Sequence, residues 1–294
     1  MRIDNVPSAL LDEKARAELF GERRPYGMPT AGIVEDVEKL SVDDLMAFYR
    51  RFYTPNNAVL IVAGDTTTET VRKFAEQYYG PIPSRPVEAR KRPAEGGPNL
   101  PQQASRADAR VAEPSWGRDY LAPSYRVGET RHAYALQVLS RLFGGSETSR
   151  LWRALVVDNH LALSAGAGYS ASSLGLSSFG IDAQPARGAT FAQVEQAVAY
   201  EMKKVLDGAV GAEEVERAQN RLLASAIYAQ DSMGSGPRRY GAALSTGNSV
   251  ADVDAWPQRI AEVRPEDVVA AARHVWRDDG AVTSTLTPPE GKSP

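Results

Sequence analysis

The chain contains no cysteine among its 294 residues. That absence excludes disulfide bonds, thiolate metal ligands and cysteine nucleophiles, and it is compatible with a reducing or an oxidising compartment. A basic excess is also missing, since 34 lysines and arginines stand against 37 aspartates and glutamates. Because nucleic-acid binding normally needs a clustered basic excess, we expect no nucleic-acid partner.

Long apolar runs are absent as well. No run approaches the ~18 residues of a membrane span, and residues 1–7 lack the apolar core of a signal peptide. No Gly-x-Ser-x-Gly stretch occurs, which argues against a serine hydrolase. What remains is the composition of a globular protein, with 43% hydrophobic and 24% charged residues.

Proline marks a division of the chain. Residues 81–107 hold six prolines and a Gly-Gly pair. Such a proline density disfavours both helices and central strands. We therefore predict a first unit over residues 1–85, a Pro-rich linker over 86–107 and a second unit over 108–294.

Before the linker, the pattern predicts two helices, then a strand, then a further helix. Ser41 can cap a helix, with Asp44 as its partner in a capping box. The continuous apolar run 58–63 predicts a buried strand, and Thr68 is predicted to cap the next helix. Aromatic residues recur at helical spacing, which favours core packing; they are Tyr49, Phe52, Tyr53, Tyr78 and Tyr79.

After the linker, helices and strands segregate instead of alternating. We predict helices over 129–143, 147–158, 191–206 and 212–228, with shorter ones up to Trp276. A Gly- and Ser-rich hairpin is predicted over 161–170 and 176–183, and a last strand over 281–286. This order favours an α+β fold over a doubly wound sheet.

Residues 41–59 and 264–282 look like an internal repeat. At an offset of 223 positions and without a gap, apolar positions coincide, for example Leu45 with Val268 and Val59 with Val282. Any two amphipathic helices followed by strands can align, but the gapless carry-over favours a true repeat. The first of two homologous sheet-plus-helices units would then lack its N-terminal half, roughly 118 residues. The chain would be a fragment, or a partner would cover the exposed half-unit.

Several segments together resemble the pitrilysin/insulinase peptidases. The similar stretches are Arg24-Pro25-Tyr26-Gly27, Asp43-Asp44-Leu45, Phe48 to Ala58, Val62-Ala63-Gly64-Asp65, Tyr79 to Pro83, and Gly144-Gly145-Ser146 with Ser149-Arg150-Leu151. They follow the family's order and spacing over nearly the whole chain. The resemblance implies a zinc metallopeptidase built from two homologous α+β units per half-molecule.

The resemblance also shows what this sequence lacks. In the family, zinc is held by an inverted His-x-x-Glu-His helix in the first unit, whose glutamate acts as general base. His132, His160 and His274 are far apart, and none is followed by a Glu-His pair. We therefore expect ordinary histidines, no catalytic residue and no metal ligand in this chain, and Zn²⁺ only in a full-length family member.

A second departure concerns substrate binding. Family members that bind substrate through the second unit have an arginine and a tyrosine seven residues apart. This chain has Val156 and Leu163 at the matching positions. Neither side chain can donate a hydrogen bond. Some bacterial members divide these roles between two chains, which makes a homologous partner chain and a heterodimer the expectation.

Three residues are the candidate peptide contacts: Tyr169, Leu163 and Arg150. The strand over 161–170 would receive a peptide or unfolded protein by strand addition, or line a chamber. The leading hypothesis is a zinc metalloendopeptidase fragment that helps to enclose a peptide chamber and is inactive alone. The alternative is a non-catalytic subunit or scaffold of a heterodimeric peptidase. Resemblance and cysteine content favour the periplasm and leave the cytoplasm open.

Overall fold

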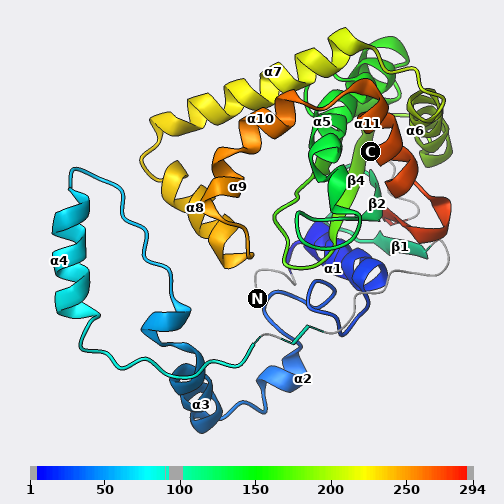
Figure 1. The fold of residues 1–294 in the computed structure, drawn as a ribbon. Coiled ribbons are helices and arrows are strands. Elements are labelled where there is room, and N and C mark those ends of the chain that lie inside the picture. The colour runs from blue at the N-terminus through cyan, green and yellow to red at the C-terminus, as the bar shows by residue number, and fades with distance from the viewer. Residues whose placement is uncertain (1–4, 90, 93–101, 290–294) are drawn as a thin grey trace. The chain divides into compact units, whose positions relative to one another are not determined.

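The computed structural model describes residues 5–89, 91–92 and 102–289 (Figure 1). Their contacts group them into two units. Unit 1 comprises residues 1–29, 95–224 and 255–294, and unit 2 comprises residues 30–94 and 225–254. The sequence prediction divided the chain at one linker, whereas unit 1 joins the first residues of the chain to those that follow the proline-rich stretch.

Unit 1 is built on a five-stranded mixed sheet in the order β1-β5-β2-β4-β3. Its strands are β1 (Gln102–Ala107), β2 (Ser115–Ala122), β3 (Ala162–Tyr169), β4 (Ser177–Pro185) and β5 (Ala281–Thr287). Only the β1–β5 pairing is parallel. The predicted linker therefore ends too late: residues 102–107 form an edge strand, because polar side chains suit an edge and only Ala104 is buried.

One face of this sheet carries the main core. The helices that cover it include α5 (Ala133–Gly144), α6 (Phe191–Leu206) and α11 (Pro265–Val275). Alternate residues of β4 point toward them, namely Phe179, Ile181 and Ala183, as the period of a half-buried strand requires. A largely antiparallel sheet with most of its covering helices on one face confirms the α+β class.

The opposite face is only partly covered. Helix α1 (Pro7–Phe20) packs over β1 and β5 through an apolar cluster that includes Leu11, Leu19, Val282 and Leu286. Pro7 at the first turn of α1 costs no hydrogen bond, because its missing N–H would have no partner inside the helix. Toward β4 and β3 the same sheet face carries glycine and aspartate.

The remaining elements agree closely with the predicted ones. Helices α6 and α7 (Ala212–Tyr228) have the predicted bounds, and α10 (Trp256–Ala261) follows. The predicted helix 147–158 begins only at Arg150, and its stretch η3 (Trp152–Asp158) is a π-helix. Within the described residues, no helix is long and apolar enough to cross a membrane. The short 3₁₀ segments of this unit are η2 (Thr130–His132) and η5 (Asp278–Gly280).

Unit 2 is mainly helical. It contains α2 (Val34–Val37), α3 (Val42–Phe52), η1 (Pro55–Asn57), α4 (Thr68–Tyr78), η4 (Ala229–Asp231), α8 (Ser235–Ser245) and α9 (Val250–Asp254), with the end of α7. The capping box predicted at Ser41 is confirmed, since Ser41 and Asp44 each accept a hydrogen bond from the other's backbone N–H. The cap of α4 is Thr67 rather than Thr68.

The local structures of the two repeat segments coincide. Moving α3 and η1 along the chain by the repeat offset gives the bounds of α11 and η5. Both helices begin with the same contact, a backbone N–H donating to an aspartate Oδ2 at 2.9 Å, from Ser41 to Asp44 and from Arg264 to Asp267. Sequence alone thus determines the same helix, cap and break twice.

The surroundings of the two segments differ. Val268 of α11 is 0% exposed, whereas its counterpart Leu45 in α3 is 57% exposed. β5 pairs with strands on both sides, but residues 58–63 form no strand. The predicted buried strand is therefore wrong for this structure, because no described strand pairs with residues 58–63. The predicted aromatic core of α3 and α4 is also wrong, because Tyr49, Tyr53, Tyr78 and Tyr79 are exposed.

Candidate functional site

The strand β3 forms one edge of the sheet. Within the described residues, β3 pairs only with β4, so its outer edge carries backbone groups with no strand partner. A register shift between Ala162 and Ser164 makes Leu163 the extra residue of a β-bulge. Bulges re-aim side chains at sheet edges, and the Leu163 side chain is 52% exposed.

The segment that leads into β3 is irregular. The π-helix η3 ends where the Asn159 N–H and Nδ2 both donate to the Ala154 carbonyl. His160 follows with φ +51°, in the left-handed region. π-Helical turns and left-handed non-glycine residues occur preferentially at functional sites. Both positions of the family's Arg/Tyr pair, Val156 and Leu163, belong to this irregular stretch.

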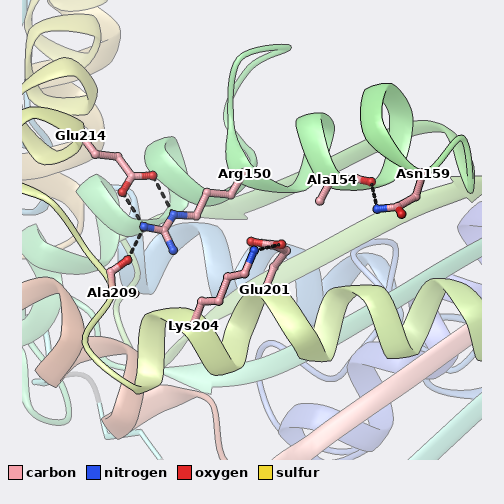
Figure 2. A network of polar contacts seen from close by, with 7 residues as sticks. All are labelled: Arg150, Ala154, Asn159, Glu201, Lys204, Ala209 and Glu214. Atoms are coloured by element: carbon pink, nitrogen blue, oxygen red, sulfur yellow. Dashed lines mark hydrogen bonds and ion pairs between the residues drawn. The ribbon is translucent and has the colours of Figure 1, made fainter.

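Arg150 is held by protein partners (Figure 2). Its guanidinium forms a two-pronged ion pair with Glu214 of α7, with N–O distances of 2.6 and 2.5 Å, and also donates to the Ala209 carbonyl. The Glu214 carboxylate raises the pKa of Arg150. The Arg150 side chain is 16% exposed. These contacts tie the start of the helix before β3 to the loop between α6 and α7.

Tyr169 stands at the other end of β3. Its hydroxyl donates to the Pro123 carbonyl at 2.5 Å, its ring stacks on Phe179, and burial raises its pKa. Tyr169 and Leu163 are six positions apart, or about 20 Å along a strand. The structure therefore does not bring the three predicted contacts together: Leu163 is accessible, whereas Tyr169 and Arg150 have protein partners for their polar groups.

A groove that the sequence analysis missed lies on the sheet face beside α1. It has a volume of about 450 Å³ and is lined by α1, β2, β3 and β4. Its floor has little side-chain cover because Gly166 and Gly168 of β3 face Asp182 and Gly180 of β4. A sequence signal was present: Gly117-x-Asp119 and Gly180-x-Asp182 repeat with the period of a strand, which places both carboxylates on one face.

Carboxylates crowd this groove. Asp182 leans over Gly166, where a Cβ would lie 3.1 Å from Oδ1, and Asp119 leans over Gly180. The pKa of Asp119 is raised to about 6, first by burial and then by the negative charges of Asp12 and Asp182. Burial also raises the pKa of Asp182, and that of Asp12 despite the opposing charge of Arg16. Within the described part of the chain, no group donates a hydrogen bond to Asp119 or Asp182.

The described histidines do not fit a zinc site. Zinc in proteins takes three or four nitrogen, sulfur or oxygen ligands. Residues 5–89, 91–92 and 102–289 contain no group of three His, Asp or Glu side chains that could hold a metal ion. The rings of His132 and His274 stack with centroids 4.9 Å apart, and burial lowers the pKa of His132. No catalytic step through zinc can be derived from these residues.

A mixed sheet covered by helices, with an open antiparallel edge, is an α+β architecture that can be compared with solved structures. The fold is similar to that of a protease from Helicobacter pylori, with a TM-score of 0.85 and 20% identity over 98% of this chain and 68% of the other. It is also similar to a peptidase M16 inactive domain from Pseudomonas fluorescens, with a TM-score of 0.80 and 18% identity over 100% and 68% of the two chains. At these identities the likeness shows the fold alone.

The sequence establishes the family. The chain belongs to the peptidase M16 inactive domain family, whose model matches residues 39–222. It is 26% identical over 163 residues to the zinc protease PqqE of Helicobacter pylori, covering 55% of this chain and 36% of that protein. It is also 26% identical over 281 residues to an uncharacterized zinc protease of Mycobacterium leprae, covering 92% and 60%. The chain thus spans less than two thirds of either relative.

Proposed function

We propose that this chain is the non-catalytic, substrate-holding part of an M16-type zinc peptidase, and that another segment or chain supplies the zinc-binding histidines. The match to an inactive-domain family and the zinc-protease names of relatives support this proposal. So does the sequence itself, which contains no His-x-x-Glu-His motif. The chain would enclose a peptide chamber together with that catalytic partner.

The observation that carries the peptide-holding role is the open edge of β3. A peptide in extended conformation can add to such an edge through main-chain hydrogen bonds, which give affinity for many sequences. The bulge exposes Leu163 at the start of this edge. Arg150 and Tyr169 act in this proposal as positioning residues: Arg150 ties the start of the helix that precedes β3 to α7, and Tyr169 ties the last residue of β3 to Pro123.

Backbone-modified peptides test strand addition directly. We expect an extended peptide of about ten residues to bind the chain in a fluorescence-anisotropy titration. N-methylation of every second amide removes donors on one edge only, so one methylation register should abolish binding and the other should leave it nearly unchanged. Equal loss in both registers, or in neither, would contradict strand addition. The bound peptide should stay intact with added Zn²⁺, and cleavage by this chain alone would contradict the non-catalytic role.

The exposed face of α3 is the proposed docking surface for the partner. Its counterpart α11 is buried against the helices and sheet of unit 1, and β5 lies between two strands. If residues 42–63 are to be covered as α11 and β5 are, the partner must supply helices against α3 and a strand on each side of residues 58–63. The partner would therefore be homologous to the part of unit 1 that precedes α11.

Matched substitutions at the repeat positions test whether this face awaits a partner. Val268→Asp buries an unpaired charge and should prevent unit 1 from folding. Leu45→Asp, at the equivalent position, should change the free energy of unfolding of the purified chain by less than about 0.5 kcal/mol, as is usual for surface substitutions. Thermal and urea denaturation measure both. A large destabilisation by Leu45→Asp would show that the face is already covered.

A further inference from the structure

The groove beside β3 bears on which peptides the open edge can accept. On the α1 side of the sheet, the row of residues that crosses from the open edge runs through Gly166, Asp182 and Gly117. The next row runs through Gly168, Gly180 and Asp119. Because a peptide strand beside β3 would continue these rows, every second side chain would face the groove.

Of the two carboxylates that the strands themselves bring to the groove, Asp182 on β4 lies nearer the open edge than Asp119 on β2. Strands are about 4.8 Å apart, so an added strand would lie two spacings from β4 and three from β2. Asp182 shortens the gap because it leans across Gly166, which has no side chain to intervene. The long stem of a lysine or arginine can bridge the remainder, whereas short side chains cannot. Asp119, one strand farther away, adds negative potential without direct contact.

The charges of the groove favour a cation in this position. Asp119 and Asp182 have no hydrogen-bond donor within the described residues, and burial and mutual repulsion disfavour the charged form of Asp119. Burial raises the pKa of Asp12, and the charge of Arg16, also on α1, opposes that shift. Asp182 is exposed in this structure, so a cationic side chain from a bound strand can reach it and supply the counter-charge that it lacks, and a charge-assisted hydrogen bond of this kind is stronger than a neutral one.

We infer that the peptide accepted at β3 carries a lysine or arginine that pairs with Asp182. This inference rests on the proposed peptide-holding function and names its substrate class, a basic extended peptide. The selecting residue is Asp182, and Gly166 permits the contact because any larger side chain would stand between Asp182 and the edge.

Two matched peptides test the inference. One is a threonine-rich peptide with lysine at alternate positions, and the other has glutamine in place of each lysine. We expect the chain to bind the lysine peptide about tenfold more tightly in fluorescence anisotropy, a difference of about 1.4 kcal/mol. Asp182→Asn should remove the difference while leaving the affinity for the glutamine peptide unchanged. Glu216→Gln, which removes one exposed negative charge on α7, should preserve the difference.

Charge reversal gives a second, independent result. Asp182→Lys should prefer a peptide with glutamate at the same alternate positions, and circular dichroism will show that each variant remains folded. Equal affinity of the unchanged chain for lysine and glutamine peptides would overturn the inference and leave strand addition standing. Binding of neither peptide would overturn both the inference and the proposed function.

Discussion

Replacing Gly144 by alanine is expected to destabilise unit 1 by about 3 kcal/mol, the upper end for overpacking. Gly144 is the last residue of α5, where the helix passes directly over β3. An added Cβ would lie 2.1 Å from the Ala167 amide nitrogen and 2.4 Å from the Gly166 carbonyl carbon. Both obstacles are strand backbone, which cannot turn aside as a flexible side chain can. Urea denaturation followed by circular dichroism measures the loss.

The matched control lies on the strand itself. Gly168→Ala places a Cβ on β3 where nothing lies within 4 Å, so we expect it to change the free energy of unfolding by less than about 0.5 kcal/mol. If Gly144→Ala were as mild as this control, α5 and β3 would not approach each other as closely as the structure has it. Because Gly144→Ala would displace β3, we also expect this variant to bind peptide more weakly than the unchanged chain.

Replacing Asp119 by asparagine is expected to stabilise the protein at neutral and alkaline pH. Burial raises the pKa of this carboxyl to about 6 in the folded protein, against 3.8 for an unperturbed aspartate. Such a shift corresponds to about 3 kcal/mol of lost stability once the group is charged. Asparagine keeps the shape and removes the charge, so we expect a gain of about 2 kcal/mol at pH 8.

The pH dependence has a definite sign. The pKa of Asp119 is raised in the folded protein, so below pH 4 the carboxyl is protonated in both the folded and the unfolded chain and costs no stability. As the pH rises through 6, the carboxyl becomes charged in the folded protein and that stability is lost. The stability difference between Asp119→Asn and the unchanged chain should therefore grow between pH 4 and pH 6 and level off above. His132, whose pKa is lowered, opposes this trend in each protein and cancels in the difference.

Glu216→Gln is the control for this experiment, since it removes the same charge from an exposed position. It should show no step near pH 6. A flat difference between pH 4 and pH 8 for Asp119→Asn would mean that Asp119 is solvated and that the groove is more open than its contacts indicate.

Local sequence signals anticipated much of the fold. The 3.6-residue spacing of apolar positions gave α6 and α7 their bounds, and the Ser41–Asp44 capping box begins α3 as predicted. Such signals depend on neighbours within four residues, so they persist whatever surrounds them. β1 was missed because its residues are polar and follow a proline-rich stretch, and only pairing with β5 makes them a strand.

The candidate site was anticipated less well. Leu163 was singled out and is accessible, but the groove with Asp119 and Asp182 was not found. Each of these aspartates is unremarkable in its own strand. They converge because β2 and β4 are neighbours and because glycines face them across the sheet. Arg150 and Tyr169 were predicted as peptide contacts, and their polar groups have partners far away in sequence, Glu214 and Pro123.

The repeat separates the two kinds of information most clearly. By itself, the sequence determined the peptidase resemblance, the α+β class, and the shared helix, cap and break of residues 41–57 and 264–280. Only the tertiary structure decided which copy is buried: β5 is a central strand, whereas residues 58–63 are not a strand at all. The physical reason is that a helix satisfies its backbone hydrogen bonds within its own segment, while a strand depends on neighbours that its own sequence does not contain.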